Sequence, residues 1–597
     1  MWFPFEKVRP VQGEFMRDVE RALEKGENLV AHAPTGVGKT AAVLSVALPF
    51  AMENGYTLFF LTPKHTQHAI VLETVRKMMG RHGVRVRVSD FIGKQWLCLI
   101  PGVKELSTKE FSDFCSNLKK EEKCPFYNNL KEARALLKEL GDKPLHSEEV
   151  KEICAEREVC PYEILLRLGR RSHLIIADYY HIFSEGVRAS FLGKMDKSLE
   201  RSILVVDEAH NLPDRLKSLM SSVLTDNMVN RGVREARKFG YLDHANILSD
   251  LLNFLRNFEE GEYPIKKEEF MEGVEEATEK DYFDLYEELT VIGNEIRLEQ
   301  KRSYVGSIAS FLESWEEEKE GFFRFVKRGK RVEIHKECLD PSLASQEVFE
   351  RAYSSILMSG TLSPPSMYAE VLGLKAKCVE YPNPFPKENR RVLIFPETTT
   401  RYVERSEESY RIIADILEKI KEACPGNMAT FFPSYEVLEG GSKFVRGEKF
   451  VERKEMKKRE RMELFKSFTS SEKGLLLAVA GGSLSEGMDY PGKFLECAVI
   501  VGIPLEKPDL LTKARISYYQ QKLGQGWNYG YIFPAMNRAI QAAGRVIRSE
   551  SDRGVIIFMD KRYLWRNYLK CIPSDWSFRV TKNPWKEVRE FFRGLSS

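Results

Sequence analysis

Short, uninterrupted apolar runs alternate along the chain with stretches of helical periodicity. Leu29–Ala33 and the run SILVV before Asp207 lie in the N-terminal part, and MATFFP, GLLLAVAGG, ECAVIVGIPL and GVIIFMD follow in the C-terminal part. Runs without a polar face are typical of parallel strands that helices cover on both sides. The pattern predicts an α/β protein with two domains, each built on a parallel sheet.

Two intervals between the predicted strands contain more residues than the alternation of strands and helices requires. Between Thr40 and Asp207 the chain has about seventy residues more than the expected strands and helices would occupy. From His210 to Ser359 a second excess is largely helical by its pattern, with long amphipathic segments at 229–258 and 268–293. Both excesses predict segments inserted into the first domain.

A glycine-rich segment, APTGVGKT, separates the first apolar run from an apolar helical stretch. In a strand–loop–helix context, glycines such as Gly36 and Gly38 let backbone N–H groups surround phosphates. Lys39 then reaches the terminal phosphates, and the Thr40 hydroxyl binds Mg²⁺. The segment predicts a site for ATP and Mg²⁺, and the alternative is a glycine-rich turn without a ligand.

The run SILVVDEAH ends in two adjacent carboxylates, Asp207 and Glu208. At the C-terminal edge of a parallel strand, such a pair suits nucleotide hydrolysis, with Asp207 coordinating Mg²⁺ and Glu208 polarising the attacking water. The tetrapeptide DEAH is weak evidence alone. After a phosphate-binding loop, it predicts the hydrolytic half of an ATPase site.

Downstream, the segment QAAGRVIR places Gln541, Arg545 and Arg548 at spacings i, i+4 and i+7. Such spacing predicts that the three side chains share one face of a helix. Arginines on a helix face of this kind suit an anion, and the γ-phosphate is the obvious one. An ordinary amphipathic helix with surface arginines is the alternative.

Net charge and hydropathy bear on the kinds of ligand that the protein binds and on its expected location. The chain has 597 residues with 91 Lys+Arg against 88 Asp+Glu, so a polyanion must be held by a local basic groove rather than by the overall field. The N-terminus lacks the pattern of a signal peptide, and the longest apolar run, AAVLSVALPFAM, is too short to span a bilayer. We expect a soluble, cytoplasmic protein that is not membrane-bound.

Five of the ten cysteines fall within residues 98–160, inside the first excess. In an intracellular protein, clustered cysteines are more often metal ligands than disulfides. Their spacing is too loose for the paired CxxC of a zinc finger, although zinc is possible on ligand type alone. The candidate ligands are Cys98, Cys115, Cys124 and Cys160, and Cys154 is expected to be a spare buried thiol.

In this order, DEAH, SGTLSP, SEGMDYPG and QAAGRVIR resemble the superfamily 2 helicases, and the cysteines resemble their iron-sulfur branch, the XPD/DinG family. The segments LTPKHTQ, NPFPKENR, FFPSY and DRGVIIFMDKRY match its archaeal XPD type. The resemblance spans nearly the whole chain. It implies two RecA-like motor domains with parallel sheets, an iron-sulfur cluster domain as the first insert and a mainly helical Arch domain as the second.

The resemblance also implies the domain order. We expect helicase domain 1 at 1–91, 172–215 and 331–365, the iron-sulfur cluster domain at 92–171, the Arch domain at 216–330 and helicase domain 2 at 366–597.

Several side chains acquire roles by this resemblance. The four cysteines would hold a [4Fe-4S] cluster. Gln12 would contact the adenine edge of ATP, unless it is a polar residue in an N-terminal cap, and Asp489 would contribute to the nucleotide site. In the stretch CPFY, Phe126 and Tyr127 either stack on bases of single-stranded DNA or pack against the cluster. Tyr162 corresponds to a damage-sensing aromatic, but Leu166 stands where the family has its partner arginine.

The expected function is an ATP-dependent 5′–3′ DNA helicase that acts on single-stranded and forked DNA in nucleotide excision repair. We expect a monomer, with a repair nuclease or other repair proteins as candidate partners. Polarity and pathway come from the resemblance. The alternatives are a DinG-like helicase for other DNA structures and an ATP-gated DNA-binding scaffold.

Overall fold

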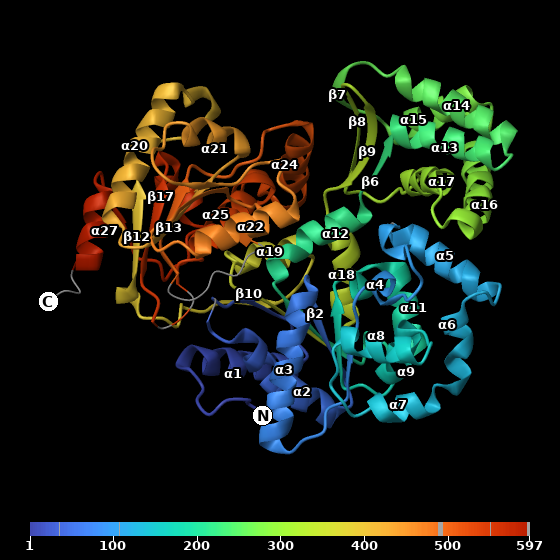
Figure 1. Cartoon of the computed structure of the whole chain (residues 1–597), viewed down its shortest axis with the longest axis horizontal. Helices are drawn as coiled ribbons and strands as arrows, with labels where there is room; N and C mark the ends of the chain where they lie inside the picture. The colour runs from blue at the N-terminus through green and yellow to red at the C-terminus, as the bar shows by residue number, and fades with distance from the viewer. Residues whose placement is uncertain (35, 107, 487–493, 548, 550, 594–597) are drawn as a thin grey trace.

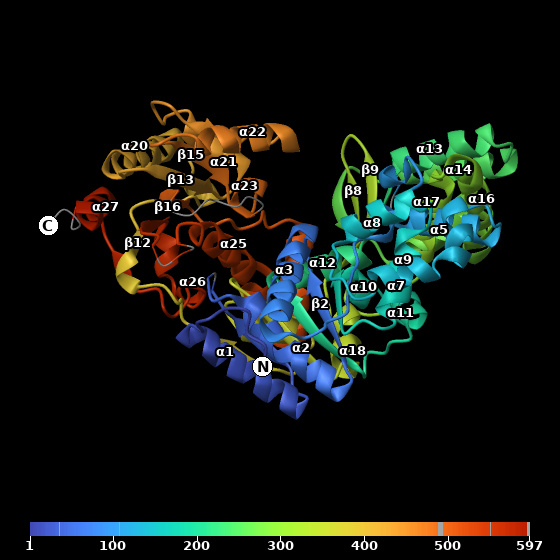
Figure 2. The same ribbon diagram turned by 60° about the horizontal axis from the view of Figure 1, so that its bottom comes forward.

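The computed structural model of the chain describes residues 1–34, 36–106, 108–486, 494–547, 549 and 551–593 (Figure 1). In these ranges, two seven-stranded parallel sheets and one four-stranded antiparallel sheet are present. Figures 1 and 2 show two α/β domains side by side, with two inserts projecting from the first on the side away from the bulk of the second. The described helices include none that is long and apolar enough to cross a bilayer.

The first α/β domain is built on a sheet of order β11-β1-β10-β5-β2-β4-β3. Its central strands are buried along their whole length, as expected for a parallel sheet covered on both faces. The strands are β1 (Leu29–His32), β2 (Thr57–Thr62), β3 (Val88–Asp90), β4 (Leu174–Asp178), β5 (Ser202–Asp207), β10 (Ser354–Ser359) and β11 (Lys377–Glu380).

Helices of this domain pack on the sheet or lead from it into the inserts. They are α1 (Pro10–Lys25), α2 (Lys39–Asn54), α3 (His65–His82), α10 (Tyr180–Phe183), α11 (Glu185–Met195), α12 (Leu212–Met220), α18 (Ser342–Arg351) and α19 (Pro365–Val371), with the short 3-10 helix η3 (Ala209–Asn211). Because β11 pairs with β1, the first sheet extends past the boundary expected at residue 365, which is therefore too early.

The first insert (residues 91–173) lies between β3 and β4 and contains only short helices among its described residues. Its core is formed by buried leucines together with Val150 and Cys154, which join the core of the first domain. The elements are α4 (Lys94–Leu97), η1 (Val103–Glu105), α5 (Thr108–Lys120), α6 (Pro125–Asn128), η2 (Asn129–Glu132), α7 (Arg134–Leu140), α8 (Ser147–Glu156) and α9 (Pro161–Gly169).

The second insert (residues 221–339) combines helices with an antiparallel sheet of order β6-β9-β8-β7. The expectation of a mainly helical domain ending at residue 330 is thus incomplete, since β9 continues to Cys338. Along β9, Val332 and Ile334 are buried while Glu333 and His335 face outward, a two-residue alternation typical of a strand. The elements are β6 (Ser222–Thr225), α13 (Asp226–Lys238), α14 (Leu242–Arg256), β7 (Gly261–Pro264), α15 (Lys267–Thr278), α16 (Tyr282–Gln300), α17 (Tyr304–Trp315), β8 (Phe322–Arg328) and β9 (Val332–Cys338).

The second α/β domain has a sheet of order β14-β15-β13-β16-β17-β12-β18. Its strands are β12 (Arg390–Phe395), β13 (Asn427–Phe432), β14 (Phe450–Val451), β15 (Leu475–Val479), β16 (Leu495–Val501), β17 (Gly554–Met559) and β18 (Phe578–Val580). Its helices are α20 (Glu407–Ala423), α21 (Tyr435–Ser442), α22 (Lys458–Thr469), α23 (Ser483–Glu486), α24 (Leu510–Leu523), α25 (Phe533–Ala543), α26 (Arg566–Leu569) and α27 (Pro584–Arg593), with 3-10 helices η4 (Lys387–Asn389), η5 (Tyr402–Glu404) and η7 (Lys561–Leu564) and a π-helical turn, η6 (Asn528–Ile532).

The second α/β domain contacts the base of the second insert through α24. Asp340, which follows β9 and is 2% exposed, accepts hydrogen bonds from Tyr518 (2.7 Å) and Lys522 (2.5 Å) of that helix. A buried carboxylate needs such partners, because burying it unpaired costs several kcal/mol. The contact therefore ties the second domain to the point where the second insert returns to the first domain.

Candidate functional site

The phosphate-binding loop connects β1 to α2 at the C-terminal edge of the first sheet. Gly36 and Gly38 have φ angles of +88° and +77°, in the left-handed region. A Cβ atom on Gly36 would lie 2.0 Å from the ring of Phe385, so only glycine fits there. Lys39 and Thr40 are the first two residues of α2, where free backbone N–H groups favour bound phosphate.

Gln12 lies beside this loop and is 5% exposed. Its side-chain amide donates to the carbonyl of Gly38 at 3.3 Å, and its Oε1 accepts from the backbone N–H of Arg9 at 3.4 Å. The Arg9 guanidinium donates to the carbonyl of Gly36. Gln12 therefore braces the loop, and its contact with adenine stays a prediction.

Asp207 ends β5, and Glu208 follows it with a φ of +49°. Burial and the charge of Glu208 raise the pKa of Asp207 to about 7. Burial opposes ionisation of Glu208 too, but its hydrogen bond with His210 and the charge of Lys39 hold its pKa well below the ordinary value. The Tyr179 hydroxyl donates to the carbonyls of Asp207 (2.5 Å) and Glu208 (3.0 Å) and fixes the turn.

A line of hydrogen bonds runs from Glu208 into the second α/β domain. Glu208 Oε2 accepts from the Ser359 hydroxyl at 3.0 Å and lies 3.2 Å from His210 Nδ1. His210 Nδ1 is 2.6 Å from the same hydroxyl, which accepts from the backbone N–H of Thr361 at 3.2 Å. Thr361 Oγ1 accepts from the side-chain amide of Gln541 on α25 at 3.2 Å. The carboxylate of the first domain is thus connected to the second domain.

The prediction of one helix face for Gln541 and the two arginines is wrong for Arg545. Helix α25 ends at Ala543, and Gly544 caps it, so Arg545 lies beyond the helix and is half-buried. Glycine weakens helix propagation by about 1 kcal/mol relative to alanine and is common where helices stop. Arg548 and Asp489 lie outside the described residues.

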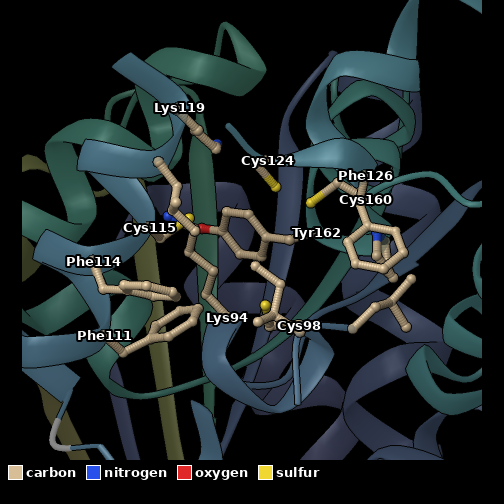
Figure 3. A pocket seen from close by; sticks show the side chains of 14 residues that line it. Lys94, Cys98, Phe111, Phe114, Cys115, Lys119, Cys124, Phe126, Cys160 and Tyr162 are labelled. Atoms are coloured by element: carbon tan, nitrogen blue, oxygen red, sulfur yellow. The ribbon is translucent and has the colours of Figure 1, made fainter. Parts of the chain in front are cut away.

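Four cysteines line one cavity in the first insert (Figure 3). Cys98 follows α4, Cys115 lies in α5, and Cys124 and Cys160 precede α6 and α9. The space inside the cavity that a water molecule can reach is small, about 20 Å³. The remaining lining residues are largely apolar, and they include Phe111, Phe114, Phe126, Pro161 and Tyr162.

The donor set of this cavity, four thiols in a largely apolar wall, is one that a metal centre can use. All four cysteines are free thiols. Burial raises the pKa of Cys98 and raises that of Cys160 to about 11, so a positively charged centre is needed to hold them as thiolates. In the described part of the chain, no group of three or more His, Cys, Asp or Glu side chains could hold a single metal ion as it stands.

The two aromatic side chains of the segment CPFY, Phe126 and Tyr127, pack around the cavity and do not project into solvent. Phe126 lines the cavity, and its carbonyl accepts from the backbone N–H of Cys160 at 2.9 Å. Tyr127 is half-buried, with Lys119 Nζ 4.4 Å from its ring. Cys154 is buried, as expected, and does not line the cavity.

Tyr162 is 8% exposed and lies in the cavity wall. Arg167 donates to the carbonyl of Leu130 at 2.9 Å instead of pairing with Tyr162. The two residues therefore do not form an exposed aromatic–arginine pair.

Sequence reasoning missed the roles of His210, Ser359 and Thr361 as links between the two carboxylates and α25. The sequence did carry a signal for these residues, because His210 is the last residue of the DEAH motif, and Ser359 and Thr361 belong to the segment SGTLSP. The sequence did not show that β10 pairs with β5, and this pairing brings the ends of the two strands together.

Family models match three parts of the chain: residues 9–99 match the DEAD/DEAH box helicase model, residues 60–229 the DEAD_2 model and residues 417–578 the helicase C-terminal domain model. The ATP-dependent DNA helicase XPD of Sulfolobus acidocaldarius is 26% identical, with 95% of this chain and 99% of the relative covered. The Saccharomyces cerevisiae factor IIH helicase subunit XPD/RAD3 is 24% identical, with 94% and 87% covered.

Solved structures show the same fold. A structure titled XPD helicase aligns with a TM-score of 0.68 at 23% identity, covering 97% of this chain and all of that chain. Xpd4 of S. tokodaii aligns with a TM-score of 0.62 at 18% identity, covering 96% and 100%.

Together, the paired parallel-sheet domains, the phosphate-binding loop and the DEAH carboxylates define an ATP-dependent helicase of superfamily 2. Within that class, the chain belongs to the XPD/Rad3 family.

The geometry of Glu208 generates a prediction. Glu208→Gln keeps the hydrogen bond from Ser359 but removes the charge that polarises water, so ATP turnover should fall about ten-thousand-fold, or about 5.5 kcal/mol of barrier. Nucleotide affinity should change little. The measurement is steady-state phosphate release with equilibrium nucleotide binding.

Glu200→Gln, the same substitution on the surface, is the control and should leave turnover unchanged. Turnover of Glu208→Gln within tenfold of the wild type would contradict the role.

Proposed function

We propose that this helicase translocates 5′ to 3′ on single-stranded DNA, carries a [4Fe-4S] cluster in its first insert and acts in nucleotide excision repair. The observation that carries the proposal is the convergence of four cysteines in one cavity of an insert within the first motor domain. The names of its relatives support the DNA substrate and the repair role, because they include a DNA helicase and a DNA repair factor subunit.

At the nucleotide site, this chain's residues would bind and orient ATP. Lys39 and the N-terminus of α2 hold the phosphates. Thr40 and Asp207 would hold Mg²⁺, which neutralises phosphate charge when bound. Glu208 stays ionised and orients the attacking water, while Arg545 stabilises charge that develops on the phosphate.

In the first insert, Cys98, Cys115, Cys124 and Cys160 would hold the cluster. When bound, the cluster supplies a cross-link between the four segments that carry these cysteines. The apolar wall, with Phe111 and Tyr162, keeps water from the thiolates.

A second candidate function is a structure-specific helicase for DNA forms other than repair bubbles. The ATP-dependent DNA helicase CHL1 of Meyerozyma guilliermondii favours it, because it is 24% identical, with 85% of this chain and 71% of the relative covered. An ATP-gated scaffold that binds DNA without unwinding is the remaining alternative. For the proposed function, a repair nuclease or other repair proteins are the candidate partners.

Unwinding assays separate these functions. With ATP and Mg²⁺, we expect strand separation of a duplex with a 5′ tail and of a fork, and little separation of a duplex with a 3′ tail. The readout is release of a labelled strand. The opposite polarity would contradict the proposal, absence of unwinding with intact ATPase activity would favour the scaffold, and a strong preference for other structures over forks and bubbles would favour the second candidate.

A paired substitution tests the ligand set. Cys124→Ser should lose iron and visible absorbance and abolish unwinding, whereas ATP hydrolysis without DNA persists because Lys39 and Glu208 lie outside the insert. Cys154→Ser, the control in the same insert, should keep its iron. The measurement is iron and sulfide content after anaerobic purification.

Iron loss from Cys154→Ser but not from Cys124→Ser would show that the ligand set is wrong. Stoichiometric zinc in the wild-type protein would exclude the cluster.

A further inference from the structure

An exposed tryptophan and two lysines form a patch on the first insert that neither the nucleotide site nor the cysteine cavity uses. Trp96 on α4 is 49% exposed. Lys104 Nζ lies 5.5 Å from the centre of its ring. Lys151 on α8 donates from Nζ to the backbone carbonyl of Trp96. We call these three residues the Trp96 patch.

The surrounding structure holds the patch in place. The Gln95 side-chain amide donates to the carbonyls of Val103 (2.6 Å) and Leu106 (2.7 Å), on either side of Lys104. In the second insert, Lys301 directly follows α16, and its Nζ donates to the carbonyl of Pro101 at 2.8 Å. Side chains fixed in this way lose less conformational entropy when they bind a ligand.

The two lysines of the patch are not neutralised. Neither forms an ion pair with a carboxylate in the described part of the chain. Burial and the charge of Lys104 lower the pKa of Lys151, and the charges of Cys98 and Glu148 oppose that shift. A local excess of positive charge raises the concentration of anions beside it.

The patch also borders the contact between the two inserts. Close to the Lys301 contact, Arg297 pairs with Asp113 at 2.7 Å and Arg302 with Glu110 at 3.2 Å, which joins α16 and its C-terminal end to α5 (Figure 1). A strand that reaches the place where the inserts meet would therefore pass an aromatic ring and two cations.

We propose that the Trp96 patch binds single-stranded nucleic acid, with a base stacked on the Trp96 ring and the adjacent phosphates contacting Lys104 and Lys151. The inference rests on the proposed function, since it assumes that the helicase tracks a single strand of DNA. A flat aromatic surface beside cations is the combination that binds single strands without reading their sequence. An acidic protein surface would be attracted by the lysines but has less use for an exposed, rigid ring.

The test is the affinity of the full-length protein for a fluorescent poly-dT oligonucleotide, measured by anisotropy at several salt concentrations. Trp96→Ala should weaken binding about five- to hundred-fold, and Trp96→Phe should recover part of it because a ring remains. Lys104→Ala should reduce the slope of log affinity against log salt by about 0.7, the contribution of one phosphate contact. ATP hydrolysis without DNA should not change in any variant.

Lys138→Ala, on the exposed surface of α7 in the same insert, is the charge-matched control and should change neither quantity. The inference would be overturned if Trp96→Ala and Lys104→Ala bound the oligonucleotide with the same affinity and salt slope as Lys138→Ala. A protein partner would then explain the patch. If Trp96→Ala misfolds, the salt dependence of binding by Lys104→Ala is sufficient to test the inference. A wild-type protein that binds no single strand contradicts the proposed function itself, which distinguishes the two failures.

Discussion

Hydrogen bonds join the two α/β domains of this helicase at the nucleotide edge, and the rest of the structure is arranged around them. The half-buried carboxylate of Glu208 is held by fixed partners, Ser359 and His210. Through Thr361, the same group of side chains reaches Gln541 on α25. The side chains around the γ-phosphate position therefore belong to both domains, and such an arrangement is a requirement for converting hydrolysis into movement of one domain against the other.

Side-chain contacts connect the second α/β domain to the second insert and the second insert to the first. The second α/β domain contacts Asp340 through Tyr518 and Lys522, at the base of the second insert. The second insert in turn contacts the first through Arg297 and Asp113. A continuous set of packed elements thus links the nucleotide edge to the insert with the cysteine cavity. The first insert holds its position by these side-chain pairs and by buried residues that it shares with the core of the first domain.

Much of the fold was predictable, because fully buried parallel strands appear as continuous apolar runs and the loop before Lys39 has a fixed chemistry. Two features were not predicted. Strand β11 carries no long apolar run, since it lies at a sheet edge. Helix α25 ends at Ala543, although the spacing of polar residues continues. For Phe126, the sequence left stacking on DNA and packing against the cavity as alternatives, because the choice depends on contacts between segments far apart in the sequence. The alternation along β9 was a readable strand signal within a region of helical pattern.

The most direct test of the link between the domains is a double-mutant cycle on Thr361 and Gln541. Thr361→Val removes the acceptor, Gln541→Leu removes the donor, and neither changes side-chain size much. The measurement is DNA-stimulated ATP turnover of the two single variants and the double variant. The account predicts strong non-additivity, with an interaction energy of about 1 kcal/mol or more, because the second substitution removes a bond already lost. Additive effects would show that the two domains are not coupled through this bond.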